Sequence, residues 1–271
     1  MKIIDTHVHI GGERVGFFMT EEMVATMMDK YHIDYAVVSN ADSAEMDHEQ
    51  NLLPQQYTQE ENLKRMIRFV RKHTDKITIA VWVKPYTQGL TKELQKMIED
   101  NLDIISGIKL HPFHSNTSPV DKKCLPYLEL ADRLKLAVVS HTGGCEAASP
   151  IHLYEAAKMF PDIPFVMVHM GLGSDNTEAL DLLGKADNLY GDTTWVKMST
   201  TMEAIRRYGN RKIMFGSDAP IDGIDTYLCN KYGDRSLYQD YFNVLPQLIS
   251  KEDYEMLMYK NAEKIFKLNI V

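Results

Sequence analysis

The sequence predicts an α/β protein that forms a single-domain (β/α)8 barrel, a TIM barrel, over residues 1–271. Short apolar runs rich in Ile, Val and Leu recur along the chain, and longer segments with helical periodicity separate them. Parallel strands joined by crossover helices produce this alternation. The length of 271 residues also lies in the range that a single hydrophobic core can serve.

Eight buried strands are expected in order along the chain. Their ranges are 3–9, 35–39, 77–83, 104–110, 136–140, 165–169, 189–192 and 213–217. Amphipathic helices are expected between them, for example at 60–73 and 91–101, and closing helices at 237–249 and 251–266. Eight alternations favour a closed barrel over the alternative of an open, doubly wound sheet, because no GxGxxG motif follows the first strand.

Two connections are longer and more polar than a usual strand-to-helix loop, namely 40–57 and 218–236. Both follow the C-terminal end of an expected strand, where barrel enzymes build their active sites. We therefore expect both segments to shape or cover a pocket, and disorder is the alternative.

Composition excludes several classes of protein. The formal net charge is −8, and no cluster of Lys and Arg is long enough to follow a phosphate backbone, so nucleic acid is not an expected partner. No apolar stretch approaches about 18 residues, so no membrane span is expected. Cys124, Cys145 and Cys229 are widely spaced, which indicates a reducing, cytoplasmic location. The expected partner is a small-molecule substrate, and a homodimer remains open.

Histidines and one aspartate mark the ends of the expected strands. Side chains alternate along a strand, so His7 and His9 should point to the same side. The others are His111 after the fourth strand, His141 after the fifth, His169 closing the sixth, and Asp218 after the eighth. The C-terminal ends of barrel strands meet at one rim, which would gather these side chains into one site. The remaining histidines are expected on helices or loops: His32, His48, His73, His114 and His152.

Four motifs in this order resemble those of the amidohydrolase superfamily, in the branch that includes aminocarboxymuconate semialdehyde decarboxylase. They are Asp-Thr-His-Val-His at 5–9, Ser-His-Thr-Gly-Gly at 140–144, Val-His-Met-Gly at 168–171, and Phe-Gly-Ser-Asp-Ala-Pro at 215–220. The segment 261–266 also resembles the closing helix of that branch. The resemblance implies that His7, His9, His141 and Asp218 bind one metal ion, usually zinc. Three imidazoles and a carboxylate suit Zn²⁺, which lowers the pKa of a bound water to about 7.

The resemblance also implies catalytic roles for two residues. His169 would act as a base or hydrogen-bond partner for the water, and its alternatives are a fifth metal ligand or a buried structural histidine. Asp218 would accept the proton of the water and deliver it to the leaving group. Lys109 ends the fourth strand and is expected either to face the substrate as ammonium or, if carboxylated, to bridge a second metal.

Further residues near strand ends are candidate substrate contacts. His111 shares a strand face with Lys109, and a purely structural role is the alternative. Arg14 and Trp195 also follow strand ends, as do Lys84, Asp192 and Asp222. Arg14, Lys84 and Lys109 together would favour a carboxylate-bearing substrate, whereas the alternative is that these are solvated rim residues.

The sequence therefore predicts a metal-dependent hydrolase that uses a metal-activated water on an amide, lactone or other ester-like bond. The alternative within enzymes is metal-dependent nonoxidative decarboxylation of an unsaturated or aromatic acid. A catalytically inactive metal-binding barrel is a third, minor alternative.

Overall fold

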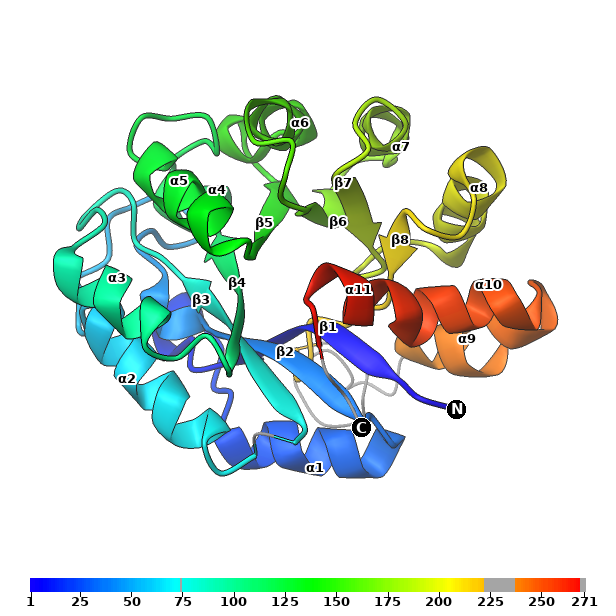
Figure 1. Ribbon diagram of the computed structural model, residues 1–271, viewed down its shortest axis with the longest axis horizontal. Coiled ribbons are helices and arrows are strands. Elements are labelled where there is room, and N and C mark those ends of the chain that lie inside the picture. Colours follow the sequence, from blue (N-terminus) through cyan, green and yellow to red (C-terminus); the bar gives the residue numbers. More distant parts are fainter. Residues whose placement is uncertain (74, 222–236, 269–271) are drawn as a thin grey trace.

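The eight parallel strands form one sheet in sequence order, and helices surround this sheet (Figure 1). The computed structural model describes residues 1–73, 75–221 and 237–268. The strands are β1 Ile4–Ile10, β2 Tyr35–Asn40, β3 Ile77–Trp82, β4 Ile105–Leu110, β5 Ala137–Gly143, β6 Phe165–Leu172, β7 Leu189–Asp192 and β8 Ile213–Met214. The strand order never reverses, which excludes the open, doubly wound alternative and confirms the predicted fold class.

Backbone hydrogen bonds between β1 and the segment after β8 close the barrel. The amide of Thr6 donates to the carbonyl of Phe215 (3.0 Å), and the amide of His9 donates to the carbonyl of Ala219 (2.8 Å). The regular strand β8 is shorter than the predicted range 213–217, and the backbone turns at Asp218 with a φ of 68°. The closing contacts are therefore made partly by irregular backbone.

The helices lie outside the strands, and several are short. They are α1 Glu21–Tyr31, α2 Gln59–Val70, α3 Lys92–Glu99, α4 Pro112–Ser115, α5 Leu125–Leu134, α6 Pro150–Met159, α7 Thr177–Leu183, α8 Met198–Tyr208, α9 Leu237–Asn243, α10 Lys251–Glu255 and α11 Asn261–Ile265. Short 3₁₀ turns are η1 Glu13–Val15, η2 Ala41–Ser43, η3 Glu146–Ala148 and η5 Leu245–Gln247, and η6 Met256–Lys260 is a π-helical turn.

Helix starts follow simple capping chemistry. Thr58 and Glu61 form a capping box at α2, and the hydroxyl of Thr91 caps α3.

The two predicted closing helices are each interrupted, since η5 follows α9 and η6 separates α10 from α11.

Two apolar clusters hold the barrel together. The outer cluster packs strand residues such as Val138 and Met167 against the helices. The inner cluster joins inward side chains of the strands, such as Val139 and Val168, with Ala262, Ile265 and Phe266 at the C-terminal helix α11. Helix α11 therefore fills one end of the barrel, and the other end is left for polar side chains.

Candidate metal centre

The first strand places two histidines inside the barrel by means of a β-bulge. Asp5 pairs with Ala36 of β2 and Val8 pairs with Val38, so β1 has one residue more than β2 between these points. Ile4 belongs to the inner cluster, and strict alternation from Ile4 would send His7 outward. The bulge reverses the alternation, so His7 and His9 face inward, with their Nε2 atoms 2.7 Å apart.

Asp218 reaches the same point from the segment after β8. Its Oδ1 lies 3.4 Å from Nε2 of His7 and 3.1 Å from Nε2 of His9. The backbone amide of Asp218 donates to the carbonyl of His7 at 2.9 Å, which fixes its position on β1. The ligand atoms of His7, His9 and Asp218 all lie within 4.8 Å of one another, and all three residues are buried.

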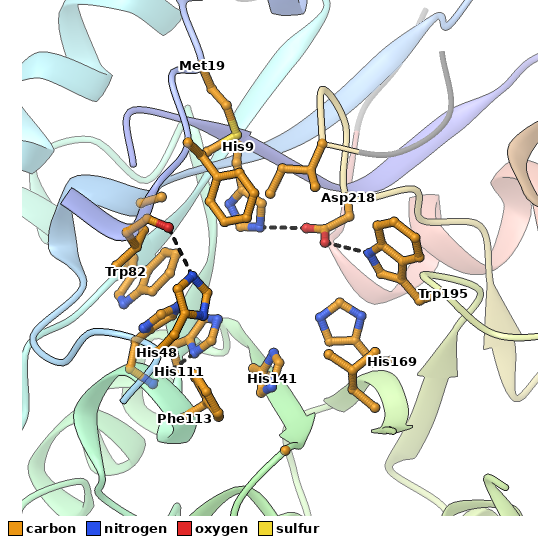
Figure 2. Close-up of a pocket in the computed structure, with 17 residues that line it drawn as sticks. His9, Met19, His48, Trp82, His111, Phe113, His141, His169, Trp195 and Asp218 are labelled. Atoms are coloured by element: carbon orange, nitrogen blue, oxygen red, sulfur yellow. Dashed lines mark hydrogen bonds and ion pairs between the residues drawn. The ribbon is translucent and has the colours of Figure 1, made fainter. Parts of the chain in front are cut away.

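Polar neighbours surround these three side chains. The Oγ of Ser39 lies 2.9 Å from Nδ1 of His9, and Oδ2 of Asp192 lies 3.4 Å from Nδ1 of His7. These partners leave both Nε2 atoms directed at the common point. The indole N–H of Trp195 donates to Oδ2 of Asp218 at 2.7 Å (Figure 2), so Oδ1 faces the histidines.

Burial and neighbouring side chains shift the pKa values of His7 and Asp218. Burial lowers the pKa of His7 well below its usual value, and the charge of Lys109 lowers it further. Burial alone would raise the pKa of Asp218, but the hydrogen bond with His9 and the proximity of His7 hold this pKa well below its usual range. Neutral imidazole and ionised carboxylate are the forms that bind a divalent metal, so this donor set fits such an ion.

Lys109 lies against His7. Its Nζ is 3.3 Å from Nε2 of His7, and its side chain is fully buried. Burial lowers the pKa of Lys109 to about 8, although Asp218 and Asp192 favour the charged form. Lys109, like His7, is not among the described side chains that line the pocket.

His111, His141 and His169 line the cavity across from His9 and Asp218 (Figure 2). The His141 ring stacks on His111 at 4.2 Å, and its centroid lies 4.7 Å from that of His169. Nε2 of His141 lies 3.1 Å from the carbonyl of Gly143, and its buried Nδ1 has no hydrogen-bond partner among the described residues. His141 lies outside the group of three converging donors, so its role as a ligand stays a prediction.

Three residues of the pocket have a left-handed backbone conformation, which residues other than glycine rarely adopt. The φ values are 67° at His169, 58° at Trp195 and 68° at Asp218. Val168 faces the inner cluster, so a regular strand would direct His169 away from the cavity. The left-handed turn at His169 brings its ring into the pocket, where Nδ1 lies 3.3 Å from the carbonyl of Thr194.

The pocket has a volume of about 270 Å³ and opens above these residues. Its described wall includes Trp195 and His111, both expected from the sequence. It also includes His48 and His114, which sequence reasoning assigned to loops or helices away from the site. His48 lies in the connection 40–57 that was expected to cover a pocket, and His114 follows His111 by three residues, which places both on one face of a helical turn.

Two predicted cations do not reach the described wall. Arg14 is exposed on η1, and Nζ of the buried Lys84 donates to the carbonyl of Tyr57 at 2.7 Å. Ile221, in the long connection 218–236, lines the pocket. The predicted rim residue Asp222, in the same connection, lies outside the described residues. The side chains on which a carboxylate-bearing substrate was expected therefore lie elsewhere.

The barrel and its three converging donors define a metal-binding α/β barrel. A family model described as Amidohydrolase matches residues 4–268. The chain therefore belongs to the amidohydrolase family, whose members are metal-dependent hydrolases and decarboxylases. This confirms the resemblance drawn from the motifs. No curated protein sequence matches the chain.

Solved structures share the fold at low sequence identity. A probable 2-pyrone-4,6-dicarboxylic acid hydrolase from Acinetobacter baumannii, with citric acid bound, has a TM-score of 0.68 at 14% identity, covering 99% of this chain and 100% of its own. 2,6-Dihydroxybenzoate decarboxylase from Rhizobium has a TM-score of 0.71 at 16% identity, covering 99% of each chain.

A dihydroxybenzoic acid decarboxylase from Polaromonas sp. JS666, with bound manganese and the inhibitor 2-nitroresorcinol, has a TM-score of 0.70 at 14% identity, covering 99% of this chain and 97% of its own. At such identities the likeness shows the shared fold. No helix in the described part of the chain combines the length and apolar character that crossing a bilayer requires.

Proposed function

We propose that the protein is a metal-dependent hydrolase that cleaves an amide, lactone or other ester-like bond of a small molecule. The observation that carries this proposal is the convergence of His7, His9 and Asp218, two of which, His9 and Asp218, line a pocket together with His169. His141 is the proposed fourth ligand, through its unpartnered Nδ1. Imidazole and carboxylate donors suit Zn²⁺, our proposed metal.

A divalent ion bound there would supply Lewis acidity and lower the pKa of a water. His169 would hold that water. Its Nδ1 points to the carbonyl of Thr194, which can only accept a hydrogen bond, so the ring proton lies on Nδ1 and Nε2 is free to accept. Asp218 would take the proton of the water and pass it to the leaving group.

The test of this assignment is the substitution Asp218→Asn in the metal-loaded protein. We expect loss of turnover on a panel of esters, lactones and amides, because the amide neither carries the charge nor accepts the proton. Elemental analysis of the same samples would give the metal content. An Asp218→Asn variant with full metal-dependent hydrolysis would refute the mechanism.

Decarboxylation of an aromatic or unsaturated acid is the second candidate function. The aromatic side chains of the pocket wall, such as Trp82 and Phe113, suit a flat ring, and two structures that share the fold are dihydroxybenzoate decarboxylases. Release of carbon dioxide from a panel of such acids, with no hydrolysed product from the esters, would favour this reaction. A protein that turns over neither panel would match the third alternative, an inactive metal-binding barrel.

The number of metal ions is a separate part of the proposal. We propose one ion per chain, with Lys109 left uncarboxylated. Two equivalents in elemental analysis would instead support a carboxylated Lys109 that bridges two ions. Light scattering in solution would test the predicted option of a homodimer.

A further inference from the structure

The side walls of the pocket are apolar and largely aromatic. Trp82, Phe113 and Trp195 surround the cavity (Figure 2), and Phe17 also lines it. Aliphatic side chains such as Ile221 fill the spaces between the rings. A cavity of about 270 Å³ with such walls fits a small, flat group better than a flexible polar chain.

No lysine or arginine lines the pocket in the part of the chain that the structure describes. Arg14 is exposed, the ammonium of Lys84 donates to the carbonyl of Tyr57, and the Nζ of Lys109 lies 3.3 Å from Nε2 of His7. Asp218 is a negatively charged member of the wall. A carboxylate on the part of the substrate away from the metal would lose its water without gaining a cationic partner from this wall, which is unfavourable.

His111 adds one directed, neutral hydrogen-bond donor. Its Nδ1 accepts the backbone N–H of His114 at 3.2 Å, so the ring proton lies on Nε2. The ring is stacked between Trp82, at 4.5 Å with planes 8° apart, and His141, which fixes its orientation. His111 lines the pocket, so its Nε2–H can donate to a neutral oxygen of a ligand.

From these observations we propose that the pocket selects a planar, uncharged, mainly apolar substrate, of the class of aryl esters and aromatic lactones. This proposal rests on the hydrolase function proposed above and specifies its substrate. It replaces the carboxylate-bearing substrate expected from the sequence. The ring of the substrate would lie between the aromatic walls, and His111 would donate to an ether or carbonyl oxygen.

Two matched pairs of compounds test the proposal on the metal-loaded protein. Phenyl acetate and 4-acetoxybenzoate carry the same ester and differ by one carboxylate. Acetophenone and 4-acetylbenzoate differ in the same way and cannot be hydrolysed. The chain has two tryptophans, Trp82 and Trp195, and both line the pocket, so intrinsic fluorescence reports binding there directly.

We expect kcat/KM to be at least about tenfold higher for phenyl acetate than for 4-acetoxybenzoate, with acetophenone binding tighter than 4-acetylbenzoate by a similar factor. Equal or better use of the carboxylated member of either pair would overturn the proposal. If neither ester is hydrolysed, the hydrolase function fails, yet the ketone pair still decides the substrate class. Absence of binding by both ketones would also overturn it.

A charge placed on the wall gives a second, independent measurement. Phe17→Lys adds a cation to the pocket and should shift the preference toward 4-acetylbenzoate by about tenfold. Phe18→Lys makes the same change at the neighbouring residue, whose side chain is 63% exposed and does not line the pocket, and should leave the preference unchanged. Equal effects of the two variants would show that the wall does not set the preference.

Discussion

The indole of Trp195 should strengthen metal binding without touching the metal. Its N–H donates to Oδ2 of Asp218 at 2.7 Å, and the carboxylate is buried, so Trp195→Phe removes a hydrogen bond to a charged acceptor and keeps the aromatic bulk. Such a bond contributes about 1.5–3 kcal/mol, and each 1.4 kcal/mol is about tenfold in affinity. We therefore expect the variant to bind Zn²⁺ roughly 10- to 100-fold more weakly.

Competition with a chromophoric chelator measures this affinity directly. Trp82→Phe is the matched control, because Trp82 lines the same pocket and stacks on His111 but makes no bond to Asp218. The control should bind metal nearly as well as the unchanged protein. A Trp195→Phe variant with undiminished affinity would refute the idea that the indole positions Asp218.

Three further perturbations follow from the structure. Ser39→Ala removes the partner of Nδ1 of His9 and should weaken metal binding about tenfold in the same titration; an unchanged affinity would contradict this. Burial lowers the pKa of His114 to about 4 from a usual 6.5. Between about pH 6.5 and pH 4, this histidine is therefore protonated in the unfolded chain and neutral in the folded chain, so stability falls as the pH falls. Because of this histidine, the free energy of unfolding should fall by roughly 3 kcal/mol as the pH falls through that range. In urea titrations, His114→Gln should show a smaller fall in unfolding free energy than the unchanged protein. Gly143→Ala would put a Cβ 2.2 Å from the amide nitrogen of Leu172 and should lower the Tm strongly. Gly209→Ala is the control, because φ is also positive there but the space is open, and it should lower the Tm far less. Equal losses of Tm in the two variants would argue against the close approach.

Much of the fold follows from patterns that the sequence displays openly. Alternation of apolar runs with amphipathic segments was enough to predict eight parallel strands and their order. Irregularities within a strand, such as a β-bulge, were harder to predict from the sequence. The β-bulge at Asp5 to Val8 turns both His7 and His9 inward, against the alternation that Ile4 begins. No residue type in that segment signals the bulge.

The gathering of the site could be predicted because strand ends meet at one rim of a barrel: His7, His9 and Asp218 converge, and His111, His141 and His169 line the same pocket. The inward direction of His7, His9 and His169 depends on a β-bulge and on left-handed backbone, which strand alternation does not predict. Residues whose direction depends on loop conformation were not predictable. Arg14 and Lys84 follow strand ends yet do not line the pocket, while His48 reaches the wall from a long connection and contacts the carbonyl of Val15.

The arrangement of the inner cluster has a consequence for synthesis on the ribosome. Ile4 and Val37 are made before the rest of the barrel, whereas their packing partners Ile265 and Phe266 are made after it. The nascent chain must therefore carry an uncovered apolar end for most of its elongation. Until α11 has been made, that apolar end is open to water and is the part of the partly made barrel most prone to aggregate.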